Sequence, residues 1–173
     1  MDKRERQLDV EETINKYSDL LYKTSFLMLK NQQDSEDIVQ ETFIAYIKNN
    51  PELNDEEHKK AWLLKVAQNK CKNLLKSHKI RAYVPFDDVE EVIPGEEKEL
   101  YEEDSSELLA ISNLSYKYKS VITLYYIENY SIEETAKILD ISVSAVKMRL
   151  KRGREKLKIE FKDREDLLKG GAY

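Results

Sequence analysis

The strongest concentration of positive charge in the sequence lies near its C-terminal end, in residues 147–158. This stretch contains seven Lys or Arg residues and one Glu, a net charge of +6. At 100° per residue it predicts an amphipathic helix with the cations on one face. The opposite, apolar face would consist of Val143, Val146, Leu150, Gly153 and Leu157. Because neutralised phosphates supply most of the affinity for DNA, this helix is a candidate nucleic-acid surface.

The residues before the basic helix predict a second, shorter helix joined to it by a tight turn. Ser131 and Glu134 have the S-x-x-E spacing of a capping box, which begins a helix. Asp140 and Ile141 predict a turn, after which Ser142 can cap the basic helix. A short helix, a tight turn and a basic helix form the layout of a helix-turn-helix, whose second helix enters the DNA major groove. The alternative from the pattern alone is a helical hairpin whose charged face is only solvated.

The overall net charge of −5 conceals an alternation of basic and acidic segments. Residues 58–84 contain eight Lys or Arg and no acidic residue, whereas residues 87–107 contain eleven acidic residues and one Lys. The acidic segment has no usable periodicity and is punctuated by Pro85, Pro94 and Gly95. We therefore predict a linker there, extended by self-repulsion, between two helical domains.

The composition favours an all-α protein without enzymatic chemistry. Four Gly and three Pro among 173 residues are too few turn residues for a many-stranded sheet protein. Cys71 is the only cysteine, and His58 and His78 have no metal-ligand partners nearby in the sequence, so we expect no metal and no cofactor. No stretch reaches the length of a membrane span, and the first residues have no apolar signal region. We therefore expect a cytoplasmic protein without direct membrane insertion.

Helical periodicity also organises the N-terminal half. Residues 8–30 predict one helix, and residues 35–48 predict a second, with Asp34 as its N-cap. The core side of the second helix is predicted to hold Val39, Phe43, Tyr46 and Ile47. Its outward side would hold Asp37, Gln40 and Glu41. Such an acidic strip is normally only solvated, and docking of a partner is the alternative.

A loop at residues 49–57 precedes a long basic helix at residues 58–79. The face opposite its core carries Trp62, Lys65, Asn69, Lys72 and Lys76. A Trp on a cationic, amide-bearing face can stack on an unpaired base. Trp62 can equally pack against a neighbouring helix, and the sequence leaves both interpretations open.

Three motifs resemble those of extracytoplasmic-function (ECF) sigma factors of bacterial RNA polymerase. DSEDIVQETFIAYIKN (residues 34–49) resembles the polymerase-binding helix of sigma region 2, and KAWLLKVAQNKCKNLLK (residues 60–76) resembles the helix that follows it. YSIEETAKILDISVSAVKMRLKRGREKL (residues 130–157) resembles the promoter-reading part of sigma region 4. The resemblance implies region 2 at residues 8–82, an acidic flexible linker at 83–105, region 4 at 106–162 and a frayed tail at 163–173.

The resemblance also implies partners and sites. The core-polymerase-binding residues would be Asp37, Gln40 and Glu41, docked on the β′ clamp helices. The apolar surface around residues 124–127 would meet the polymerase β-flap. The minus-ten element would be bound by Asn49, Asn50, Asn54, Trp62, Lys65, Asn69, Lys72 and Lys76. The minus-thirty-five element would be bound by Ser142, Ser144, Lys147, Met148, Arg149, Lys151, Arg152 and Arg154.

In the same way, many members of this family are held inactive by an anti-sigma factor, often one anchored in the membrane, so such a partner is expected here. The chain departs from the usual motifs at four informative positions. Lys59 stands where an aromatic residue is usual, Gln68 replaces an Arg, Asn73 replaces an Asp, and Asp140 replaces the Gly of the turn. Since Asp tolerates the left-handed conformation, we expect the turn to survive. The rival interpretation is a stand-alone helix-turn-helix regulator, which would need a sensor or receiver domain that residues 1–80 do not suggest.

Overall fold

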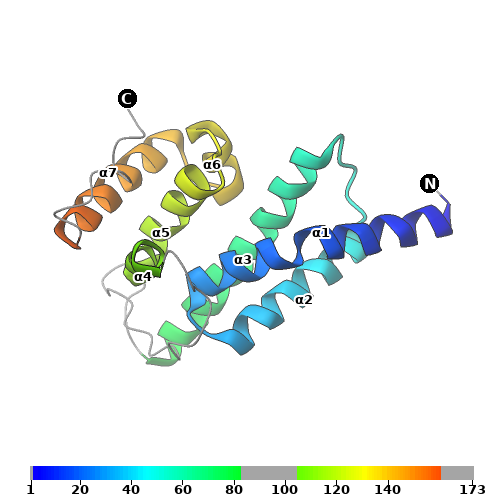
Figure 1. Cartoon of the computed structure of the whole chain (residues 1–173), viewed down its shortest axis with the longest axis horizontal. Coiled ribbons are helices and arrows are strands. Elements are labelled where there is room, and N and C mark those ends of the chain that lie inside the picture. The colour runs from blue at the N-terminus through cyan, green and yellow to red at the C-terminus, as the bar shows by residue number, and fades with distance from the viewer. Residues whose placement is uncertain (1, 83–104, 161–173) are drawn as a thin grey trace.

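The computed structural model describes residues 2–82 and 105–160, and within these ranges every regular element is helical (Figure 1). The predicted all-α class is therefore confirmed. The predicted linker, apart from Ser105, and the predicted tail lie outside the described residues. The N-terminal helices are α1 (Lys3–Leu29), α2 (Gln32–Asn49) and α3 (Glu56–Ala82). The C-terminal elements are α4 (Ser105–Asn113), α5 (Tyr116–Ile122), the π-helical η1 (Thr123–Ile127), α6 (Ile132–Leu139) and α7 (Val143–Glu160).

The first three helices pack around a common apolar core. Leu21 and Met28 of α1 and Leu63 and Leu64 of α3 are fully buried there. The predicted start of α2 is wrong by three residues, because Asn31 and not Asp34 is its N-cap. The Asn31 side chain accepts a hydrogen bond from the Asp34 backbone N–H at 2.8 Å, which places Asp34 in the first turn.

Ile47 was predicted to be a core residue of α2, and this prediction is wrong, because 49% of it is exposed. The buried face of α2 carries Ile38, Phe43 and Tyr46. Since successive residues on a helix are rotated by about 100°, a helix that turns Tyr46 inward leaves Ile47 at the edge of that face.

The helix-turn-helix predicted in the C-terminal half is confirmed in its details. Ser131 and Glu134 form a reciprocal capping box at the start of α6, with distances of 2.8 and 3.1 Å. Asp140 ends α6 in the left-handed region, with φ 54° and ψ 50°, as expected for a residue that replaces Gly. Ser142 caps α7 by accepting a hydrogen bond from the Ala145 N–H at 3.0 Å.

The apolar face of α7 packs against α5. Val146, Leu150 and Leu157 are buried, whereas Val143 is 36% exposed, so its predicted core position is wrong. The buried face begins one turn later than predicted, at Val146. Gly153 lies so close to α5 that a Cβ at this position would stand 3.0 Å from Ile122 Cδ1. The missing side chain at Gly153 therefore lets the two helices approach closely.

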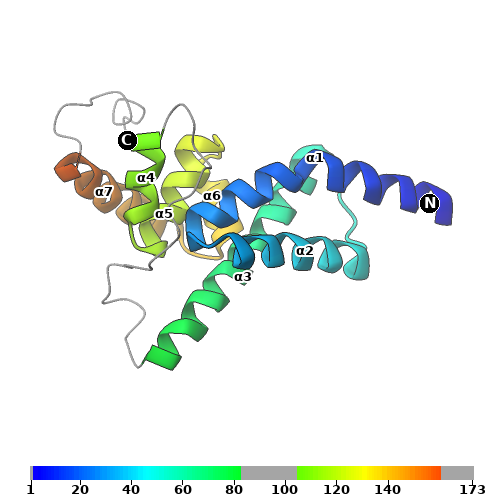
Figure 2. The same ribbon diagram turned by 60° about the horizontal axis from the view of Figure 1, so that its bottom comes forward.

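The two domains are in direct contact (Figures 1 and 2). Helix α6 packs against α3, and α4 and α5 pack against α1. The Tyr116 hydroxyl lies 3.2 Å from the backbone O and 3.1 Å from Oε1 of Gln68 on α3. Lys60 of α3 pairs with Glu128 at 3.0 Å and lies 5.6 Å from the centre of the Tyr130 ring. The interface between the domains therefore contains polar as well as apolar groups. Gln68 of α3 and Lys119 of α5 are each only 1% exposed.

Candidate nucleic-acid interface

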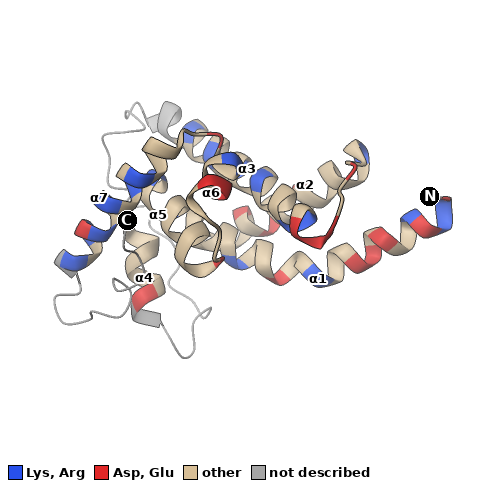
Figure 3. Ribbon diagram, turned by 90° about the horizontal axis from the view of Figure 1, so that it is seen from above, with Lys and Arg blue, Asp and Glu red and all other residues tan. Residues whose placement is uncertain are grey.

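Helix α7 carries the predicted Lys and Arg residues along its length (Figure 3), and most of their side chains are exposed. Because Val146 and Leu150 fix the buried side, the cations are turned outward. Arg149 and Arg154 are half-buried, and Arg154 Nη1 donates to the Tyr126 hydroxyl at 3.3 Å. The remaining candidates are exposed: Ser142, Ser144, Lys147, Met148, Lys151 and Arg152. The structure therefore brings all eight predicted minus-thirty-five residues to an accessible surface that begins at the capped N-terminus of the helix.

A second basic surface runs along α3. Lys65, Asn69 and Lys76 are exposed, and Lys72 is half-buried. Trp62, also half-buried, meets the Tyr46 ring of α2 at a centroid distance of 5.9 Å and an interplanar angle of 63°. Of the two interpretations left open for Trp62, this contact supports packing against a neighbouring helix.

The predicted amides of the loop lie at one end of α3. Asn49 is the last residue of α2, and Asn50 ends that helix in the left-handed region with φ 41°. Asn54 is exposed in the connection, and Asp55 begins α3 by accepting from the His58 N–H at 2.8 Å. The loop therefore presents its amides beside the N-terminal end of the cationic α3 face.

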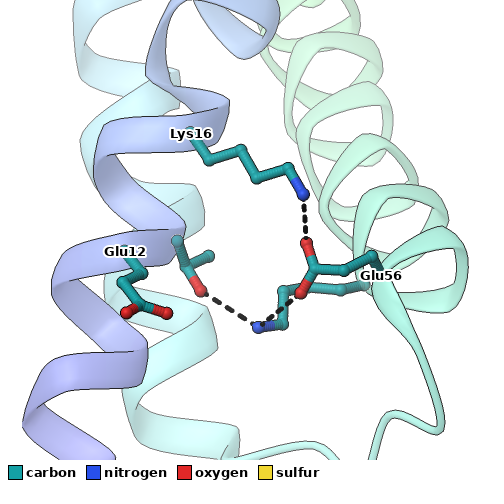
Figure 4. A pocket seen from close by; sticks show the side chains of 5 residues that line it. Glu12, Lys16 and Glu56 are labelled. Carbon is teal, nitrogen blue, oxygen red and sulfur yellow. Dashed lines mark hydrogen bonds and ion pairs between the residues drawn. The ribbon is translucent and has the colours of Figure 1, made fainter.

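A cluster of charged and hydroxyl side chains lies beneath this loop, around a cavity of about 130 Å³ between α1 and α3 (Figure 4). Glu56 accepts from Lys16 at 2.7 Å and from the Tyr17 hydroxyl at 2.8 Å. These two hydrogen bonds hold the pKa of the Glu56 carboxyl at about 2. Lys59 donates to Asp9 at 2.8 Å. Burial alone would lower the pKa of Lys59, but its interactions with Asp9, Tyr46 and Glu56 together outweigh burial and raise it.

The predicted docking residues of α2 form an exposed strip with an apolar extension. Asp37, Gln40 and Glu41 are all exposed, and Glu41 pairs with Lys70 of α3 at 3.0 Å. The strip continues into Ile44, which is 47% exposed. Ile44 was missed by the sequence analysis, although its spacing from Asp37 and Gln40 places it on the same face of the helix. A mixed acidic, amide and aliphatic strip is chemically suited to docking a protein.

The surface predicted around residues 124–127 needs a correction. Leu124 is fully buried and cannot contact a partner. Ile127 is 38% exposed, and Tyr125 and Tyr126 are half-buried. The π-helical turn of η1 turns Leu124 inward and leaves Ile127 at the surface. Within residues 2–82 and 105–160, no helix is both long enough and apolar enough to cross a membrane.

Comparison with known proteins finds one family match in each half of the chain. Residues 13–80 match the family described as Sigma-70 region 2, and residues 107–157 match the family described as Sigma-70, region 4. The chain is 32% identical over 164 residues to the ECF RNA polymerase sigma factor SigW of Bacillus subtilis, covering 85% of this chain and 86% of the relative. It is 30% identical over 146 residues to the RNA polymerase sigma factor SigV of the same organism, covering 84% and 86%.

Two solved structures share the fold. The sigma factor RpoE, in complex with the anti-sigma factor NepR from Bartonella quintana, superposes with a TM-score of 0.67 and 21% identity, over 90% of this chain and 99% of that one. CnrH, in complex with the cytosolic domain of CnrY, superposes with a TM-score of 0.59 and 21% identity, over 90% and 89%. Both superpositions extend over the two domains of this chain.

The carboxylates beneath the loop make stability depend on pH. The pKa of Glu56 lies below its ordinary value of 4.5, and that of Asp9 below 3.8, so the folded chain binds fewer protons than the unfolded chain as the pH falls. Their stabilisation is present above about pH 4.5 and is lost as the pH falls towards 2. We expect Glu56→Gln to lose less stability than the wild type between pH 6 and pH 3, measured by urea unfolding. Glu57→Gln, one residue along, is the matched control, and equal losses in wild type and Glu56→Gln would contradict the prediction.

Proposed function

The chain belongs to the ECF group of RNA polymerase sigma factors, and from this we propose that its two domains divide promoter recognition between α3 and α7. As a sigma factor it directs RNA polymerase to promoters and is not an enzyme. The observation that carries the proposal is the pair of accessible basic surfaces, one on each domain. A stand-alone regulator is disfavoured, because residues 13–80 match sigma region 2 rather than a sensor or receiver domain.

The α7 surface is assigned to the minus-thirty-five element. Lys147, Met148, Lys151 and Arg152 lie on its outward face, where a helix in the major groove meets base edges. Ser142 is both a helix cap and an exposed hydroxyl that can still donate to a phosphate. Arg149 and Arg154 lie at the sides of the helix, and their guanidinium groups suit phosphates flanking the groove.

The loop and the cationic face of α3 are assigned to the minus-ten element. Asn49, Asn50 and Asn54 offer amides that can hydrogen-bond an unpaired base. Lys65, Lys72 and Lys76 supply cations along the adjoining helix for the backbone of a separated strand. Asn69 lies among these lysines, and Trp62 supports the surface from its packed position on Tyr46.

Core polymerase is proposed to bind on two surfaces. The α2 strip that contains Gln40, Glu41 and Ile44 would dock on the β′ clamp helices. Ile127 and its neighbouring tyrosines would meet the β-flap. By analogy with the complex of RpoE and the anti-sigma factor NepR, an anti-sigma factor is the proposed inhibitor of this chain, and the cytoplasm of a bacterial cell is the proposed location. An anti-sigma factor anchored in the membrane would hold the chain there without insertion.

The contact between the domains must open before both promoter elements are bound. Elements at minus ten and minus thirty-five are separated by roughly 85 Å of B-form DNA. Helix α3, with 27 residues, is only about 40 Å long, and α6 packs directly against it. The sequence has 22 residues between Ala82 and Ser105, and a chain of that length can reach about 70 Å when extended. We therefore propose that the contact through Tyr116 and Gln68 is broken in the promoter complex.

Truncating the exposed side chains of the docking strip should weaken polymerase binding without unfolding the chain. We expect Gln40→Ala/Glu41→Ala to reduce recovery of the β and β′ subunits with tagged protein by about tenfold or more, because central hot-spot contacts cost about 2 kcal/mol each. The readout is native co-purification. Lys70→Ala is the control, since it removes the Glu41–Lys70 ion pair but leaves the strip intact. Equal polymerase recovery with the double variant and with the wild type would show that polymerase docks on another surface of the chain.

Base-edge and phosphate contacts on α7 should differ in sequence dependence. We expect Arg152→Ala to lose about 1–3 kcal/mol against the preferred minus-thirty-five sequence and to relax selectivity at one position. Arg149→Ala should weaken binding to all sequences alike. It should also reduce the slope of the logarithm of the binding constant against the logarithm of the salt concentration by about 1. Binding of the holoenzyme to promoters with single substitutions measures the selectivity, and the same binding at several salt concentrations measures the salt slope. Uniform weakening in the Arg152 variant would contradict its assignment to a base edge.

Weakening the contact between the domains should favour separated domains. Tyr116→Phe removes the hydroxyl that donates to Gln68. Glu128→Lys places a second cation beside Lys60, so that repulsion takes the place of the Lys60–Glu128 ion pair. We expect the loss of the Tyr116 hydrogen bond alone to reduce the free energy that holds the domains together by about 1 kcal/mol. The double variant should show a larger radius of gyration than the wild type in X-ray scattering. Tyr22→Phe, whose described contacts are with Phe26 and Glu36 of the N-terminal helices, is the control. An unchanged radius of gyration in the double variant would show that these contacts do not hold the closed arrangement.

A further inference from the structure

We propose that Asp9 and Lys59 are positioning residues that fix the loop at residues 50–55 and so determine base preference within the minus-ten element. This inference rests on the proposed function of that loop. Neither residue lies on the outward cationic face of α3. Both act from beneath it, where α1 meets the end of α2 and the beginning of α3.

The α2 end of the loop is tied to Asp9 by two routes. The Tyr46 hydroxyl donates to Asp9 Oδ2 at 2.6 Å. Arg6 reaches the same oxygen at 3.0 Å with Nη1, and with Nη2 it donates to the Tyr46 carbonyl O at 3.0 Å. That carbonyl also accepts from the Asn50 N–H at 3.1 Å, the hydrogen bond that closes α2. The backbone turn at Asn50 is thus held through Arg6 and Tyr46 to a single carboxylate of α1.

The α3 end of the loop is tied to the other oxygen of the same carboxylate. Lys59 Nζ donates to Asp9 Oδ1 at 2.8 Å and to Thr13 Oγ1 at 3.3 Å, and it pairs with Glu56 at 3.3 Å. Lys59 stands in the first turn of α3, where its N–H donates to the Asp55 carbonyl at 3.0 Å. The two ends of the loop therefore meet at Asp9, one on each carboxylate oxygen.

Burial makes this connection rigid. The side chains of Lys59 and Asp9 are 14% and 24% exposed, so the charge pair is only partly screened by water. Burial by itself raises the pKa of Asp9, but the hydrogen bonds from Lys59 and Tyr46 outweigh it, and the pKa is lowered. Within the loop, Leu53 packs against the core, whereas Asn50 and Asn54 are exposed. The direction in which the amides point is therefore governed by the ends of the loop and by Leu53.

A loop held at both ends restricts which bases fit between its amides. Amide recognition of a base depends on hydrogen bonds that weaken steeply with angle. A shift of the α3 end relative to the α2 end would change which base edge the amides satisfy, without removing any group that touches DNA. A purely structural role for the Asp9–Lys59 pair would instead lower activity equally on all promoter sequences.

The test uses the full chain with core polymerase and a promoter library randomised in the minus-ten element, with a fixed minus-thirty-five element. Transcripts are sequenced to give the preference at each position. We expect Lys59→Met and Asp9→Asn each to reduce discrimination at one or more minus-ten positions by about tenfold, the value of one good base contact. Lys59→Arg should restore most of it. Lys16→Met removes the hydrogen bond from Lys16 to Glu56 and leaves the contacts of Asp9 in place. This variant should keep the minus-ten preferences within about twofold of wild type.

A second library, randomised at minus thirty-five, controls for folding, because the hydrogen-bond and ion-pair partners described for Asp9 and Lys59 lie on α1, α2 and α3, whereas the minus-thirty-five surface lies on α7. Its preferences should stay unchanged in every variant. If the Lys59 and Asp9 variants do not fold, Arg6→Met carries the test, since it removes one of the two ties at the α2 end of the loop and leaves the hydrogen bond from Lys59 to Asp9 in place. Unchanged minus-ten preferences with a uniform fall in transcript yield would overturn the positioning role. A wild-type chain with no minus-ten preference would instead remove the proposed function, and this inference with it.

Discussion

Helix α3 has to serve three surfaces at once, and the rest of the structure is arranged around that requirement. Leu63, Leu64 and Leu75 fill the core against α1 and α2. Lys60 and Gln68 meet the second domain. Lys65 and its cationic neighbours remain outside. At 100° per residue, a helix has room for three such faces, and the choice of the core face fixes where the other two point. Changes in the core packing of α3 would therefore alter both domain contact and DNA contact.

The closed arrangement combines apolar packing with polar groups that are expensive to bury. Gln68 Nε2 is buried without a hydrogen-bond partner among the described residues, and Lys119 is 1% exposed, with its ammonium 3.4 Å from the Ser112 carbonyl. An unsatisfied buried amide costs about 1–3 kcal/mol, a cost that is recovered when water reaches it. These groups make separation of the domains less unfavourable than it would be for a purely apolar interface. This suits a protein that has to reach two distant DNA elements.

Local chemistry predicted the C-terminal half of the fold well. The capping box at Ser131, the left-handed turn at Asp140 and the cap at Ser142 each depend on a few neighbouring residues, and the structure confirms all three. Predictions that depended on partners far away in the sequence fared less well. Ile47 was misplaced because the Tyr46 hydroxyl turns inward to Asp9, 37 residues earlier. Likewise, no local pattern shows that the cation at Lys59 is matched by a carboxylate on α1. The exposure of the candidate site was predictable from periodicity, whereas the network beneath it was not.

Reconstituted transcription shows whether one chain carries polymerase to promoters through two separate basic surfaces. Purified chain and core polymerase would be incubated with fragmented genomic DNA, and the transcript starts would be mapped with and without the chain. We expect starts that need the chain and share two upstream elements, one near minus ten and one near minus thirty-five. We also expect that changing the spacing between the elements abolishes initiation. Starts that share a single element, or binding of the chain to the same sites without polymerase, would contradict these expectations.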